Sequence, residues 1–400
     1  MTNPASADAA PGSLGAMLRA IRCGEACSRS ALAKATGLAP STVAIRVETL
    51  IRLGLVEEHG DEASRGGRRA RRLRLVGAAG SVAAVDIGAH HVSVGIADLN
   101  GHLLAERTAP STETDPAAFA ARLWSQIAEL SATVGAPPLR GIGIGAPAPI
   151  EHPSGRIVHP SFMPSWDRVD LPALFADHTD APVLVENDAN LTALAEIAGD
   201  PFGAPRHLLA VKLGSRIGCG VVSDGRLHRG QGGAAGEVSH TPVAGVSTIS
   251  CVCGVPNCLE SVASGGALVA RLRAEGYKVQ TPSEVVDLGR TGDPRASEVL
   301  REAGASIGGV LASIVNFFNP GDVVLGGAMS ASAPLVAAIR GELFSRCLPI
   351  AADDLDVRAA HDPEGAGIRG AIYLIIEEVL SAARVETLAA ALPAGEPVLA

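Results

Sequence analysis

The hydrophobic positions between residues 28 and 55 follow a helical spacing in two short runs with a turn between them. Ser28 can cap the first helix, which would carry Leu32 and Ala35 on its inward face. Gly37 can end this helix, because glycine readily adopts the left-handed conformation found at helix C-termini. The pattern therefore predicts a short helix that ends in a tight turn at Gly37.

A second helix is predicted to start near Pro40, since proline suits the first helical position. Val43, Val47 and Leu50 follow at i, i+4 and i+7 and would form its buried stripe. Helix, tight turn and helix are typical of the helix-turn-helix, whose second helix enters the major groove of DNA. The candidate DNA contacts on this second helix are Ser41, Thr42, Ile45 and Arg46.

Two short strands, predicted near residues 55–58 and 71–76, flank a polar loop with Gly66 and Gly67 at its tip. The segment 64–74 holds a run of basic residues with no acidic residue among them: Arg65, Arg68, Arg69, Arg71, Arg72 and Arg74. Such a hairpin fits a β-wing that contacts phosphates and the minor groove. The alternative is a helical hairpin with a solvated charge run. The candidate wing contacts are Arg65, Arg68 and Arg69.

From about residue 80 the pattern changes to alternating strands, turns and helices. Residues 81–106 predict three antiparallel strands, and residues 141–151 predict an apolar strand. Residues 182–197 predict a buried strand that turns into a helix at Asp188. Residues 208–230 repeat the strand, glycine turn and strand of the first segment. This weak duplication predicts two α/β lobes, and a cleft between two such lobes is a natural small-molecule site.

These patterns predict a division of the chain into five parts. We expect a disordered tail at 1–12, a winged helix-turn-helix at 13–76, a first lobe at 80–190, a second lobe at 191–383 and a C-terminal tail at 384–400. The last helix of the second lobe is a candidate to return to the first. The length of 400 residues agrees with two or three domains.

Composition and charge add a class of partner to this picture. Residues 1–80 carry a net charge of +5, whereas the whole chain carries −9, so residues 81–400 carry −14. A basic head on an acidic body suggests a module that binds a polyanion such as operator DNA. The sequence shows no signal peptide and no apolar run of membrane-spanning length, so we expect a cytoplasmic protein with no membrane partner.

Seven cysteines are present, and three of them, Cys251, Cys253 and Cys258, fall within eight residues. An odd number in a reducing compartment favours a metal site over disulfides. With His240 they make a His–Cys₃ set, which matches tetrahedral zinc with no position open for water. A zinc ion bound by this set would therefore be structural and not hydrolytic. The alternatives from spacing alone are a buried reduced cluster and an oxidation-prone redox pair.

Seven segments together resemble the ROK family of repressors and sugar kinases. They are "DIG" (86–88), "GAPAPIE" (145–151), "ENDANLTALAE" (186–196), "LGSRIGCGVV" (213–222), "GAAGEVSH" (233–240), "CVCGVPNCLE" (251–260) and "NPGDVVLGG" (319–327). The resemblance covers about residues 80–380, and the basic head places the chain with the repressor branch. It implies an α/β, actin/hexokinase-like fold whose two lobes close on a sugar.

The resemblance also implies a sugar site, because five residues match the sugar-contacting positions of the family: Asn187, Asp188, Glu237, His240 and Glu260. Each has an ordinary alternative. Asn187 and Asp188 could cap a helix, Glu237 and Glu260 could be surface acids, and His240 could bind zinc alone. In kinase members the residue at Asp188 is the general base, so Asp188 is catalytic only if this chain is a kinase.

The expected nucleotide loops depart from the kinase pattern. Kinase members have a D-x-G-G-T turn, but this chain places Ala89 and His90 after Gly88. A Cβ at Ala89 hinders the approach of a phosphate to the backbone. In the second loop Arg216 and Cys219 replace two glycines. The loop at 324–330, on the adenosine side, looks intact. ATP is therefore not expected as a cofactor.

The expectation from sequence is a sugar-responsive transcriptional regulator, most simply a repressor. Its head would bind operator DNA as a homodimer or tetramer, and its lobes would bind a monosaccharide or a derivative as effector. Two other classes stay open at this point. One is an ATP-dependent sugar kinase that carries a DNA-binding head, and the other is a scaffold that binds another protein and no sugar.

Overall fold

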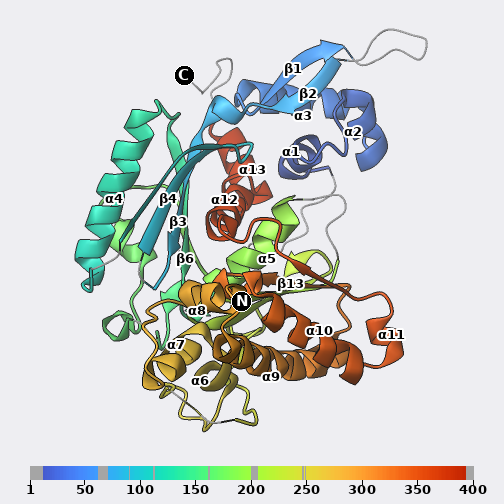
Figure 1. The fold of residues 1–400 in the computed structure, drawn as a ribbon. Coiled ribbons are helices and arrows are strands. Elements are labelled where there is room, and N and C mark those ends of the chain that lie inside the picture. The colour runs from blue at the N-terminus through green and yellow to red at the C-terminus, as the bar shows by residue number, and fades with distance from the viewer. Residues whose placement is uncertain are drawn as a thin grey trace.

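The computed structural model describes residues 12–61, 71–89, 91–110, 113–160, 163–199, 206–245, 247 and 249–392. A small head lies on one end of a larger two-lobed body (Figure 1). The head consists of α1 (Leu14–Arg22), α2 (Arg29–Thr36), α3 (Pro40–Arg52) and an antiparallel hairpin of β1 (Val56–Asp61) and β2 (Arg71–Leu75). A helix-turn-helix followed by a hairpin is the order of elements that the sequence predicts.

Local signals set the helix ends in the head. The Ser28 side chain accepts a hydrogen bond from the Ala31 backbone N–H at the start of α2, and Gly37 ends that helix with φ 69°. Val43, Val47 and Leu50 of α3 are fully buried, as their spacing predicts. One expectation is wrong: Ala35 is exposed, and Leu32 alone fills the inward face of α2. In so short a helix a single leucine side chain covers that face.

The first lobe is built on a five-stranded sheet of order β5-β4-β3-β6-β9. Its strands are β3 (Ser81–Ile87), β4 (His91–Asp98), β5 (Leu103–Pro110), β6 (Leu139–Ala146) and β9 (Val183–Asn187). The three strands predicted over residues 81–106 are antiparallel, and β6 and β9 add to them in parallel. Helix α4 (Pro116–Thr133) packs on the outer face, and a small hairpin of β7 (Ile150–Glu151) and β8 (Arg156–Ile157) follows β6.

The second lobe has a five-stranded sheet of order β12-β11-β10-β13-β14. Its strands are β10 (Leu208–Leu213), β11 (Ile217–Ser223), β12 (Arg226–Leu227), β13 (Asp322–Gly326) and β14 (Asp356–Ala359). Its helices are α6 (Leu259–Ala263), α7 (Gly265–Ala274), α8 (Pro282–Arg290), α9 (Pro294–Phe318), α10 (Ala333–Arg346) and α11 (Pro349–Ala352). When the strands of each five-stranded sheet are numbered by their order along the chain, both sheets have the order 3-2-1-4-5. This shared order matches the predicted duplication.

Two helices fill the layer between the two sheets. Helix α5 (Asp188–Gly199) follows β9 directly and packs against β10 and β11, while α12 (Ala366–Val379) packs against α5 and against β3 and β6 of the first lobe. Close contact is possible because small residues face each other: a Cβ added to Gly370 of α12 would lie 2.1 Å from the carbonyl oxygen of Leu191 in α5. The last part of the chain therefore returns to the first lobe.

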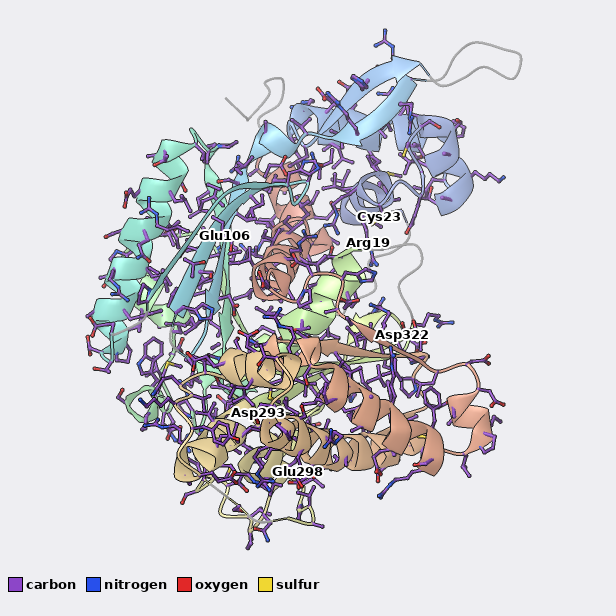
Figure 2. The ribbon with its side chains drawn as sticks, viewed as in Figure 1. Arg19, Cys23, Glu106, Asp293, Glu298 and Asp322 are labelled. Atoms are coloured by element: carbon purple, nitrogen blue, oxygen red, sulfur yellow. The ribbon has the colours of Figure 1, made fainter. Side chains whose placement is uncertain are left out.

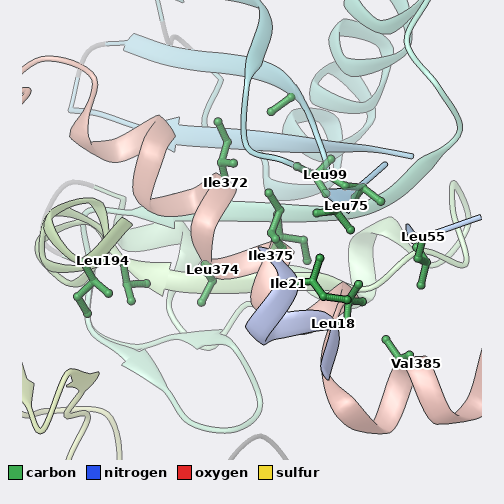
Figure 3. Packing of buried hydrophobic residues seen from close by; sticks show 14 of the residues in the cluster. Leu18, Ile21, Leu55, Leu75, Leu99, Leu194, Ile372, Leu374, Ile375 and Val385 are labelled. Carbon is green, nitrogen blue, oxygen red and sulfur yellow. The ribbon is translucent and has the colours of Figure 1, made fainter. Parts of the chain in front are cut away.

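The head and the body share one hydrophobic core. Leu18 and Ile21 of α1 group with Ile375 of α12 and with Val385 of α13 (Ala382–Ala390) (Figure 3). Most of helix α13 thus falls in the segment 384–400 that was expected as a C-terminal tail, and residues 393–400 lie outside the described part of the chain. Val385 is fully buried, so this helix gains hydrophobic burial that a free tail would lack.

Polar contacts reinforce the junction of head and body. The Leu14 backbone N–H donates to Glu386 Oε1 at 3.0 Å, and Arg22 of α1 forms an ion pair with Glu377 of α12. Arg19 and Cys23 lie on the same side of the head (Figure 2). Burial raises the pKa of Tyr373 in α12, and the positive charges of Arg22 and Arg19 oppose this shift. Within the described residues, the helices are too short or too polar to cross a bilayer.

Candidate functional site

A cleft of about 780 Å³ opens between the two lobes. Its lining includes all five residues that the sequence singles out for sugar contact: Asn187, Asp188, Glu237, His240 and Glu260. They come from four places along the chain, namely the end of β9, the start of α5, the segment around a 3-10 helix (Val238–His240) and the start of α6. The fold therefore brings these five side chains together, and their role in binding a sugar stays a prediction.

Asn187 and Asp188 have different surroundings although they are neighbours. The Asn187 Oδ1 accepts hydrogen bonds from the backbone N–H groups of Ala189 and Asn190 at 2.9 and 3.3 Å, so this side chain caps α5. Its amide Nδ2 donates to the Ala148 carbonyl at 3.0 Å. Asp188 makes no such cap and turns its carboxylate toward the cleft. The capping alternative therefore fits Asn187 but not Asp188.

The Asp188 carboxylate is paired with a lysine from the second lobe. Lys212 Nζ lies 2.7 Å from Asp188 Oδ2, and the two side chains are 27% and 16% exposed. Burial favours a neutral Lys212, but the negative charges of Asp188 and Asp86 raise the pKa of its ammonium above the ordinary value. Asp188 is thus held by a positive charge that sequence reasoning did not single out.

Glu260 is buried and fixed by two donors from the second lobe. Its Oε1 accepts from Arg216 at 3.0 Å and its Oε2 accepts from the Ile217 backbone N–H at 2.9 Å. Only 1% of Glu260 is exposed, so the surface-acid alternative is wrong for this residue. The charge of Arg216 compensates the desolvation of the carboxylate, which would otherwise be costly.

Glu237 and His240 face the same cleft from the segment that follows β12. Glu237 is exposed to the cleft, yet partial desolvation raises its pKa, and the carboxylates of Asp188 and Glu260 raise it further. Burial lowers the pKa of His240. The negative charge of Glu260 opposes this shift, and the positive charge of Arg216 adds to it. Carboxylates and an imidazole at one cleft offer both acceptors and donors, which the hydroxyl groups of a sugar need when they leave water.

A buried carboxylate next to Asn187 in the chain escaped the sequence reasoning. Glu186 is 1% exposed and its Oε2 lies 2.7 Å from Arg229 Nε and 3.4 Å from His152 Nε2. Its Oε1 accepts from Asn190 Nδ2 at 2.8 Å. Burial opposes ionisation, but His152, Arg229 and Asn190 together lower the pKa of Glu186 to about 2. An acidic residue at the end of a buried strand is the only sequence signal that pointed to it.

The predicted metal ligands form a compact cluster. One ligand atom from each of His240, Cys251, Cys253 and Cys258 lies within 4.8 Å of all the others. His240 Nδ1 lies 3.5 Å from Cys251 Sγ, so it is the ring nitrogen that faces the thiols. Thiolates about 2.3 Å from one zinc ion lie roughly 3.8 Å apart, so a small contraction of this cluster completes a tetrahedral site.

The same cluster ties two cleft segments together. Cys258 is the N-cap residue of α6, and Glu260 lies in the first turn of that helix. His240 ends the 3-10 helix that begins one residue after Glu237. Backbone pairing between Leu259 N–H and the Thr241 carbonyl, at 2.9 Å, joins the two segments. A metal ion on these ligands would fix the spacing between Glu237 and Glu260.

The loops expected to hold phosphate are filled by side chains. Arg216 crosses from the second loop to Glu260, as described above. Cys219 is buried, and this burial raises the pKa of its thiol to about 12, which makes it an inert packing residue. In the first loop, a Cβ on Gly88 would lie 2.3 Å from the ring of His91. His90 lies outside the described residues.

The candidate DNA contacts are only partly described. On α3, Ser41 and Ile45 are exposed, Ile45 to 69%, while Thr42 and Arg46 are half-buried. Arg65, Arg68 and Arg69 lie outside the described residues.

Two further arginines of the wing are engaged within the hairpin. Arg71 pairs with Glu58 at 2.7 Å and Arg74 pairs with Glu57. The hairpin register places these acids opposite the basic strand, which the sequence order alone conceals.

Comparison with known proteins gives three findings. A family model described as "ROK family" matches residues 82–378. A xylose repressor of Caldicellulosiruptor bescii is 28% identical over 383 residues, which cover 91% of this chain and 95% of that protein. A glucokinase of Thermotoga maritima is 32% identical over 328 residues, which cover 77% of this chain and 99% of that protein.

The fold also matches a solved structure. A crystal structure described as a ROK family transcriptional regulator, homolog of E. coli MLC protein, superposes with a TM-score of 0.80 at 24% identity. The match covers 94% of this chain and 98% of that chain. At this level of identity the likeness concerns the fold, and it confirms the predicted α/β architecture of a small head on a two-lobed body.

Proposed function

Because residues 82–378 match its model, the chain belongs to the ROK family, and we propose that it is a sugar-responsive transcriptional repressor. The observation that carries this proposal is the combination of parts in one chain. A helix-turn-helix with a hairpin shares a continuous core with a body whose interlobe cleft is lined by carboxylates. The likeness to a xylose repressor over 91% of the chain supports the same conclusion.

In this proposal the head binds operator DNA as half of a homodimer, or within a tetramer. Helix α3 enters the major groove with Ser41, Thr42, Ile45 and Arg46 toward the bases. The exposure of Ser41 and Ile45 supports this assignment, since a groove-facing side chain must be open to solvent in the free protein. The wing, with Arg65, Arg68 and Arg69, contacts the backbone of the DNA and supplies affinity without sequence preference.

The effector is a monosaccharide or a close derivative bound in the cleft. Asp188, Glu237 and Glu260 accept from sugar hydroxyls, while Arg216 and Lys212 can donate to sugar oxygens. His240 presents Nδ1 to the thiols, which leaves Nε2 for a sugar hydroxyl. Asn187 supports the site mainly by capping α5, the helix that positions Asp188.

Zinc is the metal that the His–Cys₃ donor set suits. His240, Cys251, Cys253 and Cys258 would supply all four ligands, so the ion would have a structural role and activate no water. Bound zinc would hold Glu237 and Glu260 at a fixed distance and so prepare the cleft for its effector.

The effector signal can reach the head through packed helices. Asp188 begins α5, α5 packs on α12, and α13 after it packs on α1 of the head. A sugar changes DNA affinity only if it binds the two arrangements of this layer with different affinity. We infer that the closed arrangement with sugar bound is the one that holds the two heads of a dimer at the wrong spacing for the operator.

The test begins with a thermal-shift screen of the full-length, zinc-loaded chain against a panel of monosaccharides and sugar phosphates. A true effector raises the unfolding midpoint, and above its Kd the midpoint continues to rise with the logarithm of its concentration. The sugar that raises the midpoint is then added to complexes of the chain with DNA. This DNA is selected from the region upstream of the chain's own coding sequence. Release of the DNA supports the repressor, and a panel without a single hit contradicts a sugar sensor.

A second candidate function is an ATP-dependent sugar kinase with a DNA-binding head. Asp188 favours it, since a carboxylate at this position can act as base, and so does the likeness to a glucokinase. Sugar-dependent release of ADP, lost in Asp188→Asn, would support the kinase. The pairing of Arg216 with Glu260 speaks for the sensor, because the arginine side chain takes up space in the loop that a kinase would use for phosphate.

A further inference from the structure

Asp86 and Lys212 hold the same place in the two duplicated sheets. Asp86 is the penultimate residue of β3, the first strand of its lobe, and Lys212 is the penultimate residue of β10. In the parallel ladders Asp86 pairs with Gly145 of β6, and Lys212 pairs with Gly326 of β13. The two lobes thus carry opposite charges at equivalent positions.

Both side chains lie on the face that each sheet turns toward the layer of α5 and α12. In β3, Val82 and Ala84 belong to the core shared with these helices. Asp86 is the next residue in this alternation, so it lies on the same face of the strand. In β10, Leu208 and Ala210 belong to the same core, and Lys212 follows in the same way. The two charges therefore face the layer between the lobes from opposite sides.

Lys212 is held in this layer by negative charge. Its Nζ lies 2.7 Å from Asp188 Oδ2, and Asp86 and Asp188 together raise the pKa of its ammonium despite burial. The choice of a lysine is distinctive in this chain. Only three lysines occur, and the other two, Lys34 and Lys278, are exposed.

Asp86 adds a second carboxylate, with a buried oxygen, to this layer. Its Oδ1 has no hydrogen-bond partner among the described residues. The carboxylate is packed tightly, because a Cβ added to Gly367 at the start of α12 would lie 2.3 Å from Asp86 Cγ. An unpaired buried carboxylate oxygen is costly, so a nearby cation stabilises it.

We propose that Lys212 is the built-in cation of the interlobe layer, which pairs with Asp188, offsets part of the negative charge of Asp86 and, in place of a divalent metal ion, bars a metal–nucleotide complex from the cleft. Divalent magnesium and manganese prefer carboxylate oxygens, and two carboxylates facing one space would attract them. A fixed ammonium neutralises part of that charge and repels a second cation.

The inference deepens the proposed function, because it explains how the cleft can respond to a sugar without a nucleotide. It rests on that function only for this consequence. Its test needs neither sugar nor DNA, so a failure here and a failure of the repressor proposal can be told apart.

The test is a titration of the full-length, zinc-loaded chain with Mn²⁺. Binding is measured as the loss of the electron paramagnetic resonance signal of free Mn²⁺. Wild type and Lys212→Arg, which keeps the charge, should bind no Mn²⁺ in the cleft. Lys212→Ser should gain one site that binds at least about tenfold more tightly than any site of wild type. The double variant Lys212→Ser with Asp188→Asn should lose the gained site.

Two outcomes overturn the proposal: wild type binds Mn²⁺ as tightly as Lys212→Ser, or a folded Lys212→Ser gains no site. Zinc content and circular dichroism check that each variant is folded.

A second measurement uses wild type and needs no change at Lys212. Reductive methylation read by mass spectrometry should modify Lys34 and Lys278 at least about tenfold faster than Lys212, because an ionised, paired amine reacts slowly.

Asp188→Asn should speed the modification of Lys212 and leave the other two lysines unchanged. Lys278→Ser is the matched control for the titration, since it removes an exposed lysine and should leave Mn²⁺ binding as in wild type. A Lys212 that reacts as fast as Lys34 in wild type contradicts the proposed pairing.

Discussion

The two lobes share one strand order but divide the chemistry between them. In the first lobe a crossover with the single long helix α4 joins β5 to β6, and the strand ends present the acidic residues Asp86 and Glu186. In the second lobe a far longer segment joins β12 to β13 and carries the His–Cys₃ cluster, while the lobe supplies the cations Lys212, Arg216 and Arg229. Duplication of a fold therefore does not imply duplication of a site.

The difference also explains what holds the lobes in register. Arg229 of the second lobe reaches Glu186 of the first at 2.7 Å, and Lys212 reaches Asp188 at the junction at 2.7 Å. Each contact joins a carboxylate to a cation from the other half. A ligand that competes for these carboxylates changes the energy of the interlobe layer, and with it the packing of α12 and α13 under the head.

The largest expected effect comes from breaking the His–Cys₃ cluster, which belongs to the second lobe. Cys253→Ser should lower zinc from about one per chain to a small fraction, and the unfolding midpoint should fall by about 5–10 °C. Sugar affinity should fall as well, because Glu237 and Glu260 lose their fixed spacing. Metal analysis and calorimetry measure this. Cys347→Ser, outside the cluster, is the control, and a metal-free variant that stays stable and binds sugar would contradict the structural role.

A change of pH tests the pairing of Glu186 with Arg229. The pKa of Glu186 is about 2 in the folded chain against an ordinary 4.5, so the pair adds stability above pH 4.5 and loses it as the pH falls toward 2. Glu186→Gln should therefore cost about 3 kcal/mol in free energy of unfolding at pH 6, and less at pH 3.

Urea unfolding at the two pH values measures the difference between variant and wild type. Glu364→Gln, at an exposed carboxylate, gives the background for a glutamate change and should show no such trend. A cost at pH 3 equal to that at pH 6 would mean that the charge of Glu186 does not stabilise the fold.

Asp188→Asn sharpens the distinction between sensor and kinase. Loss of a charged acceptor costs about 1.5–3 kcal/mol, or roughly 10–150-fold in sugar affinity. The sensor reading predicts that the variant still binds DNA but needs far more sugar to release it. Calorimetric titration with sugar measures the loss, with Asp224→Asn in the β11–β12 turn as control. Robust sugar phosphate formation by wild type, abolished in Asp188→Asn, would favour the kinase instead.

The smallest effect concerns the head, whose charge differs from that of both lobes. Arg68→Ala with Arg69→Ala should flatten the salt dependence of DNA binding by a log–log slope of about one for each lost phosphate contact. Arg74→Ala should do less, because Arg74 pairs with Glu57. Sugar affinity should not change in either variant. Unaltered salt dependence in the double variant would show that these arginines do not contact DNA.

The elements of the head and the core strands could be predicted because their signals are local. Ser28, Gly37 and Pro40 mark helix ends through their own backbone chemistry, and α2 and α3 begin and end where those residues stand. The His–Cys₃ set was also readable, since three of its ligands lie within eight residues.

The pairings between distant segments could not be predicted. Lys212 lies 24 residues from Asp188 in a strand that reads as apolar, and the partner emerges only when two sheets face one helix layer. The pairing of Arg71 with Glu58 depends on the hairpin register, which sequence order does not reveal. Ala35 was misplaced because the short α2 needs only Leu32 to cover its inward face.

The affinity for operator DNA, with and without sugar, tests the proposed repressor most directly. It is measured by fluorescence anisotropy on the full-length, zinc-loaded chain. A sugar that raises the unfolding midpoint should weaken DNA binding at least about tenfold at saturation, a coupling of about 1.4 kcal/mol. In Asp188→Asn the same release should require more sugar. A sugar that saturates the cleft and leaves operator affinity unchanged would contradict the proposal that this cleft controls the head.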